Sequence, residues 1–337
     1  MFFLSKYRYK QLSNKKKKLT GWLILEVVLI MLLFITLQYE RYVLAGVVAL
    51  KLLFVSFRYY HLRRLLESYS MFRKFSHLED EGTFEGQSPV LHEINNRKIG
   101  VLLIHGFSST PKELGILLDF LKKERIPHYA PVLTGFGLDD VHLLQAIKPS
   151  DWFRDSINAY DIFCTNCDEV VVVGNSMGGL LACHVASKRR VDKLILLAPY
   201  LLSKKKHDFS KKMLIDSPFS WMLKLFNPYV KKSRKPDDPN EHTPKPRFAY
   251  DVLPVNSVEA LWRLQEKVEY ENITAGKTLV VTGKLDNTVE NERVFELLSS
   301  KNISFESFEL EKAGHLVFEG PDSVVGVKRI VEFIKGI

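Results

Sequence analysis

Apolar residues form two long runs at the start of the chain and short runs afterwards. The first long run covers about residues 19–37 and contains Glu26, and the second covers about residues 42–57 and contains Lys51. A helix needs about 20 consecutive apolar residues to cross a bilayer, so the first run predicts a transmembrane helix and the shorter second run predicts its partner. Together they would form a helical hairpin that serves as a membrane anchor.

From residue 96 onward, short apolar runs alternate with amphipathic ones. This alternation is typical of an α/β fold, a mostly parallel sheet flanked by helices. Buried strands are predicted at residues 99–104, 169–173, 194–198, 279–282 and 305–310, and a closing helix at 323–334. The alternation stops between about residues 199 and 256, so we expect an inserted cap there. Four prolines between residues 236 and 246 preclude a regular element in that part of it. The predicted organisation is an anchor over 1–64, a linker over 65–95 and an α/β domain over 96–337.

A helix is expected to begin soon after the first of these strands. Thr110-Pro-Lys-Glu113 combines an N-cap residue, proline at the first helical position and a glutamate at the capping-box position. Glu113 is therefore predicted to close back on the start of its own helix.

Positive charge is concentrated around the two apolar runs. The chain has a formal net charge of +9, but residues 1–64 hold 12 Lys and Arg against two acids, so the remainder is close to neutral. Basic residues flank the pair of runs, with lysines at 15–18 before it and Arg58 after it. By the positive-inside rule both flanks and the α/β domain are predicted to be cytoplasmic, in a multi-pass membrane protein of the inner membrane if the cell is bacterial. If only the first run spans, the domain would lie outside.

Two features of the apolar runs have more than one interpretation. A lysine-rich start before an apolar run also occurs in signal peptides, but this run is too long, and a second run follows instead of a small-residue cleavage site. Glu26 and Lys51 would lie at a similar depth in a hairpin, so the two charges could pair. Alternatively, Lys51 extends towards the surface, and Glu26 is protonated or faces a partner subunit.

The sequence Gly174-Asn-Ser176-Met-Gly178 stands between a predicted strand and a predicted helix. Two glycines at this spacing allow a sharp turn that exposes the serine hydroxyl at the carboxyl end of the strand, as in a nucleophile elbow. The spacing alone also fits a structural turn. The strand-turn-helix setting favours Ser176 as a nucleophile.

A nucleophilic serine needs a histidine base that is oriented by an acid. With an elbow of this kind the expected chain order is serine, acid, histidine. Asp286 directly follows the strand at 279–282, and His315 lies in the loop after the last strand. Glu290 is a weaker candidate for the acid, and a surface-loop position is the alternative for His315.

The oxyanion of a tetrahedral intermediate needs preorganised hydrogen-bond donors. The backbone N–H of Met177, directly after the nucleophile, is one candidate. The N–H of Phe107, in the loop after the strand at 99–104, is the other. His105 ends that strand far upstream of Ser176, so we expect it to orient the loop and not to act as the base.

These motifs give residues 99–337 a resemblance to bacterial carboxylesterases and monoacylglycerol lipases of the α/β-hydrolase fold. The matching segments are Leu-Ile-His-Gly-Phe, Thr-Pro-Lys-Glu, Gly-Phe-Gly, Asp-Trp, Gly-Asn-Ser-Met-Gly-Gly, Gly-Lys-Leu-Asp and Ala-Gly-His. The resemblance implies the same triad and the same oxyanion amides, and it does not cover the anchor. Many relatives have histidine in the middle of Gly-Phe-Gly, where this chain has Phe136, so the edge of the pocket is expected to differ.

The cap is basic. Residues 199–235 hold ten Lys and Arg against two Asp, and within them lies an apolar stripe at helical spacing, Phe219, Met222, Leu223 and Phe226. Such a helix can lie on an anionic lipid surface, or it can pack onto the site beneath a solvated basic rim. The basic runs match no nucleic-acid-binding module, so nucleic acid is not an expected partner.

The three cysteines, Cys164, Cys167 and Cys183, cannot all pair and do not form a secreted disulfide framework. Cys164-Thr-Asn-Cys167 has no second pair and no neighbouring histidine, so packing is favoured over a redox or metal role. No cofactor and no metal are expected, and a reducing compartment fits best.

The predicted chemistry is hydrolysis of a carboxylic ester through an acyl-enzyme, with a monoacylglycerol or a related acyl lipid as substrate. A thioesterase or an acyltransferase would use the same three residues. A non-catalytic membrane scaffold is disfavoured because serine, acid and histidine all stand in the expected order. The physiological substrate, the acyl-chain length and the oligomeric state do not follow from the sequence.

Overall fold

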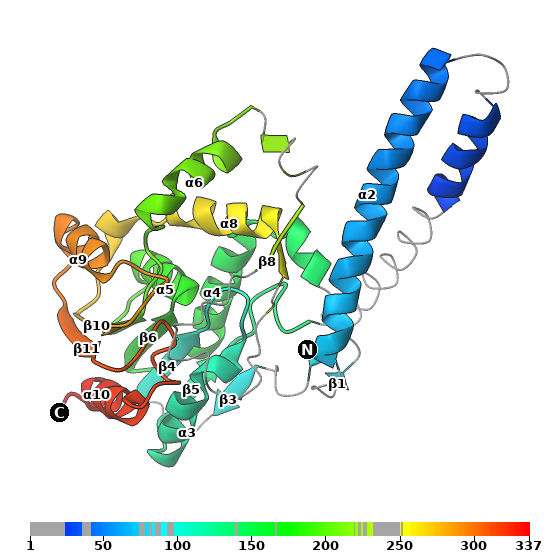
Figure 1. Cartoon of the computed structure of the whole chain (residues 1–337). Helices are drawn as coiled ribbons and strands as arrows, with labels where there is room; N and C mark the ends of the chain where they lie inside the picture. Colours follow the sequence, from blue (N-terminus) through cyan, green and yellow to red (C-terminus); the bar gives the residue numbers. More distant parts are fainter. Residues whose placement is uncertain are drawn as a thin grey trace. The chain divides into compact units, whose positions relative to one another are not determined.

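The computed structural model divides the chain into two compact units (Figure 1). One unit comprises Met1–Glu85 with Leu138–Asp140, and the other comprises Gly86–Gly137 with Val141–Ile337. The residues that the structure describes are 24–35, 42–73, 78–80, 83–84, 89–92, 98–138, 141–165, 167–218, 220–221, 224, 228–231, 250 and 252–337.

The first unit contains a pair of packed helices. Residues 24–35 are helical, and helix α2 covers Tyr42–Arg73. Leu29 of the shorter helix packs in one apolar cluster with Val48 and Val55 of α2. The hydroxyl of Ser56 donates a hydrogen bond of 2.5 Å to the carboxylate of Glu26, so the described partner of Glu26 is Ser56 and not Lys51, the partner in one of the two alternatives.

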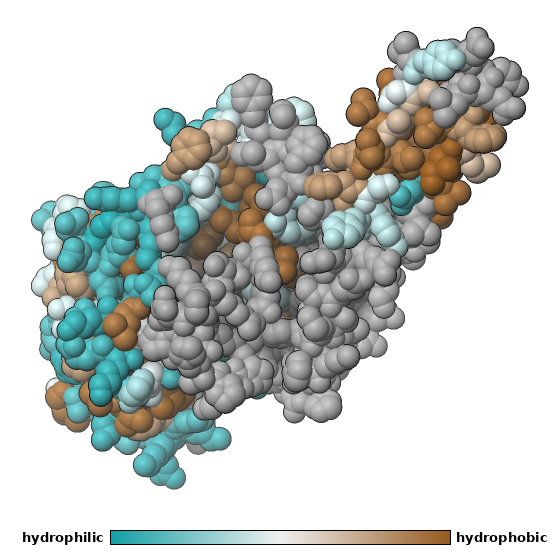
Figure 2. Space-filling model, in the orientation of Figure 1, coloured by the Kyte–Doolittle hydropathy of each residue, from teal (hydrophilic) through white to brown (hydrophobic). Residues whose placement is uncertain are grey.

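Two short strands complete the description of this unit. Strand β1 (Leu78–Asp80) pairs antiparallel with β2 (Thr83–Phe84). Large apolar side chains on the outer faces of the two helices are exposed, and Figure 2 shows them as a brown surface over the pair.

No helix in the described parts of the chain is long and apolar enough to cross a membrane. The prediction of two transmembrane helices at 19–37 and 42–57 is therefore wrong, as is the multi-pass membrane location built on it, and a bilayer partner is not supported. Residues 19–23 and 36–37 of the first predicted span lie outside the described residues. In α2 the apolar part ends at Phe57, because Arg58 follows it within the same helix.

The second unit is built on a seven-stranded sheet with the strand order β11-β10-β7-β6-β4-β5-β3. All neighbouring strands are parallel except β3, which pairs antiparallel with β5 at one edge. The strands are β3 (Val90–His92), β4 (Ile99–Ile104), β5 (His128–Ala130), β6 (Glu169–Asn175), β7 (Lys193–Leu197), β10 (Lys277–Gly283) and β11 (Glu306–Leu310). The predicted mostly parallel sheet is confirmed, and each of the five predicted strands has a counterpart in it.

Helices cover both faces of this sheet (Figure 1). They are α3 (Gly115–Lys123), α4 (Pro149–Phe163), α5 (Met177–Lys188), α8 (Val255–Gln265), α9 (Asn291–Ser300) and α10 (Ser323–Lys335), with short 3-10 helices η1 (Pro111–Leu114), η2 (Val141–Ala146) and η4 (Tyr270–Asn272). Alternate residues of the central strands, such as Val171 and Val173, join one apolar cluster with Leu117 of α3 and Ile330 of α10. Because side chains alternate across a strand, the residues between them face the opposite layer.

The stretch predicted to be a cap, residues 199–256, contains η3 (Lys205–His207), α6 (Asp208–Ile215) and the antiparallel strands β8 (Tyr229–Lys231) and β9 (Val252–Pro254). Leu214 of α6 packs against Trp262 and Val255 of α8. The predicted apolar stripe, Phe219, Met222, Leu223 and Phe226, lies outside the described residues.

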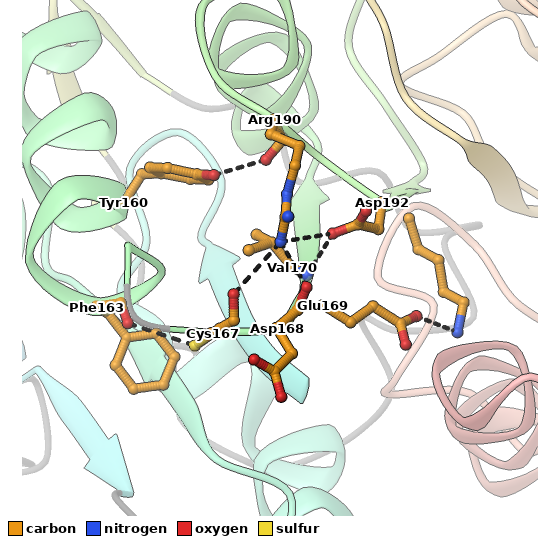
Figure 3. Close-up of polar contacts among 9 residues, drawn as sticks. Tyr160, Phe163, Cys167, Asp168, Glu169, Val170, Arg190 and Asp192 are labelled. Atoms are coloured by element: carbon orange, nitrogen blue, oxygen red, sulfur yellow. Dashed lines mark hydrogen bonds and ion pairs between the residues drawn. The ribbon is translucent and has the colours of Figure 1, made fainter. Parts of the chain in front are cut away.

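Polar contacts hold the amino-terminal ends of β6 and β7 in place (Figure 3). Arg190 donates to the carbonyl of Asp168 at 2.6 Å, and the Asp192 carboxylate accepts the N–H of Val170 at 2.8 Å. The nearly buried Lys193 ammonium pairs with Glu169 at 2.5 Å and donates to the Ile334 carbonyl at 2.6 Å. These bonds tie the loop before each strand, and the end of α10, to the sheet.

All three cysteines are buried, and none of them forms a disulfide in the described structure. Cys167 belongs to the same region, where its thiol donates to the Phe163 carbonyl at 3.6 Å (Figure 3). A Cβ on Gly100 of β4 would lie 2.2 Å from the Cys167 sulfur, so this thiol fills the space over a glycine of the sheet.

Candidate active site

Ser176 stands in the sharp turn between β6 and α5. Its backbone has φ 52° and ψ −114°, a strained conformation for a residue with a side chain. A Cβ on Gly174 would lie 2.2 Å from the Gly178 carbonyl oxygen, and a Cβ on Gly178 would lie 2.0 Å from the Ile104 carbonyl oxygen. Only glycine fits at both positions, because the turn passes so close to itself and to β4. This is the physical reason for the glycine spacing.

The structure brings three of the predicted site residues together. His315 Nε2 lies 2.9 Å from Ser176 Oγ, and His315 Nδ1 lies 2.9 Å from Asp286 Oδ2. The loop after β11 carries His315, the loop after β10 carries Asp286, and Ser176 directly follows β6. The three side chains therefore lie at the carboxyl ends of three parallel strands. The Asp286 side chain is fully buried, whereas the His315 side chain retains 15% of its exposure.

The environment of Asp286 favours its ionised form. Burial raises the pKa of this carboxyl, but His315 and the hydrogen bonds from the N–H groups of Val289 and Thr288 lower it by more, so the pKa lies below its ordinary value. Those two N–H groups donate to Asp286 Oδ1 at 2.9 and 2.6 Å. An ionised Asp286 accepts the Nδ1–H of His315, which leaves Nε2 free to accept the Ser176 hydroxyl proton.

Glu290, the weaker candidate for the acid, has another partner. It immediately precedes α9, and its carboxylate accepts a hydrogen bond of 3.1 Å from Arg293 in the first turn of that helix. Asp286 is therefore hydrogen-bonded to His315, whereas Glu290 is hydrogen-bonded to Arg293.

The predicted oxyanion donors lie at the start of α5 and in the loop after β4, the strand next to β6 in the sheet. Met177 is the first residue of α5, where backbone N–H groups have no partner within the helix and the helix dipole favours negative charge. Phe107 lies in the loop after β4. His105, the residue before Gly106 in this loop, is fully buried, and its Nε2 accepts the Leu133 N–H at 3.0 Å.

His105 is held as a neutral ring. Burial lowers the pKa of its imidazole, and an Nε2 that accepts a hydrogen bond leaves the proton on Nδ1. Nδ1 lies 2.9 Å from the Gly106 carbonyl oxygen and therefore donates to it. The expected role of His105 in orienting the loop is consistent with these two bonds.

Phe136, which replaces the histidine of many relatives, is fully buried in an aromatic cluster. Its ring stacks on Trp152 with 5.7 Å between centroids, and it meets the rings of Phe107 and His105 edge-on at 5.7 and 5.6 Å. Trp152 in turn donates its indole N–H to the Thr134 carbonyl at 3.0 Å. Phe136 therefore packs against the loop after β4 through the ring of Phe107.

The sequence did not indicate a role at the site for Glu113 or for Asn175. The carboxylate of Glu113 accepts hydrogen bonds from the Gly106 N–H and from the side-chain amide of Asn175. The predicted capping box at Thr110 is absent, because Thr110 makes no side-chain cap bond and Glu113 is directed into the site instead. A capping-box pattern and a long-range contact look the same in the sequence.

The site consists of a serine on a strand-turn-helix elbow, a histidine hydrogen-bonded to that serine, and an aspartate hydrogen-bonded to the histidine. This arrangement is typical of α/β-hydrolases. The chain belongs to the alpha/beta hydrolase family, whose sequence pattern matches residues 101–327.

Two relatives are similar to parts of the chain. A thermostable monoacylglycerol lipase of Bacillus sp. (strain H-257) is 30% identical over 108 residues, which are 32% of this chain and 42% of the lipase, so the match spans less than half of that lipase. A carboxylesterase of Bacillus subtilis (strain 168) is 21% identical over 246 residues, which are 70% of this chain and 92% of the esterase. The predicted class of enzyme, a carboxylic ester hydrolase, is consistent with these relatives.

The fold is also similar to solved structures. One, from work on LipS and LipT, two metagenome-derived lipolytic enzymes, superposes with a TM-score of 0.64 at 22% identity and covers 75% of this chain and 99% of that one. At this level of identity the likeness supports the fold.

Proposed function

We propose that this chain hydrolyses carboxylic esters of acyl lipids, with monoacylglycerols as the preferred class, through an acyl-enzyme on Ser176. The observation that carries the proposal is the continuous hydrogen-bonded chain from Ser176 Oγ through His315 to Asp286. The lipid class rests on the similarity to a monoacylglycerol lipase and to lipolytic enzymes.

Acylation begins when Ser176 Oγ attacks the ester carbonyl carbon while its proton passes to His315 Nε2. The carbonyl oxygen becomes an oxyanion, which the N–H groups of Phe107 and Met177 stabilise in this proposal. Asp286 stabilises the imidazolium and keeps it oriented. His315 then gives its proton to the leaving alcohol oxygen as the C–O bond breaks, and Ser176 remains acylated.

Deacylation uses the same groups with water in place of the alcohol. His315 takes a proton from water, the hydroxide adds to the acyl carbon, and the second oxyanion occupies the same donors. Collapse returns the proton to Ser176 Oγ and releases the fatty acid. A thioester would acylate Ser176 in the same way, and an alcohol in place of water would give acyl transfer.

Product analysis distinguishes these reactions. Purified protein is given monoacylglycerols of several acyl lengths, an acyl-CoA of matched length, and each donor with an added alcohol. We expect fatty acid and glycerol as the products, with a kcat/KM for the best monoacylglycerol at least about tenfold above that for the thioester. A higher kcat/KM for the thioester would make the protein a thioesterase, and an acylated alcohol as the main product would make it an acyltransferase.

A further inference from the structure

Glu113 connects two parts of the site that must keep a fixed distance. One is the loop after β4 that carries Phe107, called here the oxyanion loop, and the other is the end of β6 that precedes Ser176. Its Oε1 accepts the backbone N–H of Gly106, the residue before Phe107, and also accepts the Nδ2–H of Asn175 at 2.9 Å. Asn175 is the last residue of β6 and directly precedes Ser176. One carboxylate oxygen thus holds the oxyanion loop and the strand that ends in the nucleophile.

The backbone around Gly106 is restrained on both sides. Glu113 holds its N–H, and the Nδ1–H of His105 holds its carbonyl oxygen at 2.9 Å. The Gly106 carbonyl and the Phe107 N–H belong to one planar trans peptide, so the two groups point in opposite directions. Fixing the carbonyl therefore fixes the direction of the Phe107 N–H, and fixing the preceding N–H prevents rotation of that peptide about the Gly106 dihedrals.

Glycine at position 106 makes this second restraint necessary. The residue has no Cβ to limit its dihedrals, and a Cβ would fit only tightly, at 3.2 Å from both the Glu113 Oε1 and the Ser176 Cβ. Glycine lets the loop approach the nucleophile closely, but it is also the residue whose peptides rotate most easily. An external acceptor must then hold the loop.

Asn175 depends on the same carboxylate. Its side chain is almost completely buried, and its Oδ1 has no hydrogen-bond partner in the described parts of the structure, so the bond from Nδ2 to Glu113 orients the amide. Without that bond the buried Nδ2 of Asn175 would lose the hydrogen-bond partner that orients it, which is unfavourable in a site closed to water.

We propose that Glu113 is a positioning residue of the active site, which couples the oxyanion loop to the nucleophile elbow and so sets the direction of the Phe107 N–H relative to Ser176 Oγ. This proposal rests on the proposed function, since it assigns the Phe107 N–H to the oxyanion. The described hydrogen bonds of Glu113 go to Gly106 and Asn175 and not to Ser176 or His315, so in this proposal it acts through those two residues. Its effect falls on the transition state, where the oxyanion is fully developed, more than on substrate binding.

The test compares Glu113→Ala and Glu113→Gln with wild type on soluble p-nitrophenyl butyrate. Removing an oxyanion donor costs about 10²–10³ in kcat, so a misdirected donor should cost somewhat less: we expect kcat of the alanine variant to fall about 10- to 100-fold with KM within about twofold. The glutamine side chain retains an Oε1 that can accept both bonds, so it should restore kcat to within about fivefold of wild type. Lys112→Ala, which changes an exposed side chain on the same 3-10 helix, is the matched control and should leave kcat unchanged.

A second measurement separates positioning from loss of structure. A trifluoromethyl ketone forms a hemiketal oxyanion with the serine, so its Ki should rise in Glu113→Ala by about the factor by which kcat/KM falls. If Glu113→Ala does not fold, Asn175→Ala removes one of the two bonds and should lower kcat with the melting temperature still measurable. Ester hydrolysis by the wild-type protein, measured in the same experiment, tests the proposed function separately from the role of Glu113.

Three results would overturn the proposal while wild type remains active. They are an unchanged kcat in folded Glu113→Ala, a glutamine variant as impaired as the alanine variant, and an unchanged Ki for the ketone. An inactive wild type would instead contradict the proposed function itself.

Discussion

Replacing Ser176 with alanine is expected to lower kcat on p-nitrophenyl butyrate by at least about 10⁴-fold. The variant loses the only oxygen that lies 2.9 Å from His315 Nε2 among the described contacts, so no acyl-enzyme can form. The substitution removes one hydroxyl from a turn that is held by its backbone, where the Ser176 N–H donates to the Leu197 carbonyl at 2.9 Å, so the fold should be retained. Steady-state kinetics and circular dichroism on the same preparation measure both.

Ser108→Ala is a suitable control, because this serine is buried next to Phe107 in the loop after β4, while the described hydrogen bonds of His315 go to Ser176 and Asp286. It should keep activity within about tenfold of wild type, as expected for a change outside the nucleophile. Retention of more than a tenth of wild-type turnover by Ser176→Ala would show that another nucleophile performs the reaction.

The second large effect is expected at Asp286. In Asp286→Asn the side-chain amide can donate to His315, which favours the tautomer with the proton on Nε2 and removes the acceptor for the serine proton. A loss of about 10³- to 10⁴-fold in kcat follows, with KM nearly unchanged. Asp286→Ala, which removes the partner of Nδ1 without donating to it, should lose about as much.

Glu290→Gln is the matched control for this prediction. The two acids lie four residues apart in the same loop region, but only Asp286 is bonded to His315, and Glu290 is bonded to Arg293. The glutamine variant should therefore keep kcat within about threefold of wild type. If Glu290→Gln loses more activity than Asp286→Asn, the acid of the triad has been assigned to the wrong residue.

The central strands and the elbow could be predicted because local sequence carries them. Strands such as β4 and β6 are buried on both faces, so they appear as continuous apolar runs with no competing periodicity. The elbow needs glycine at 174 and 178 for steric reasons, and such positions are visible in a sequence without knowledge of the surroundings. The chain order of serine, acid and histidine then reduced the candidates for the acid to two.

Other features depend on contacts that sequence patterns do not contain. Glu113 has the right spacing for a capping box, but the Gly106 N–H and the Asn175 amide, which is 62 residues away, compete for its carboxylate. The sequence predicts that Phe136 alters the edge of the pocket, but it does not show that the ring is buried against Trp152 and Phe107. In both cases tertiary packing decides, and it lies beyond the reach of a local pattern.

At the N-terminal apolar runs, composition led to the wrong prediction of transmembrane helices. The apolar runs at 19–37 and 42–57 predict two spans, but helices can also pair through an apolar seam, and Leu29 packs with Val48 and Val55 in this way. The hydroxyl of Ser56 satisfies Glu26 within that pair. A count of apolar residues cannot distinguish a paired helix from a spanning one.

The most direct test of the site is to identify the residue that reacts covalently. A fluorophosphonate transfers its phosphonyl group to an activated serine oxygen, with fluoride as the leaving group and the serine proton taken up by the histidine. After labelling and proteolysis, mass spectrometry should find one phosphonylated peptide with the adduct on Ser176, and no adduct in Ser176→Ala or after prior incubation with a monoacylglycerol-like trifluoromethyl ketone. An adduct on another serine, or hydrolytic activity that survives complete labelling of Ser176, would contradict the assignment of Ser176 as the nucleophile.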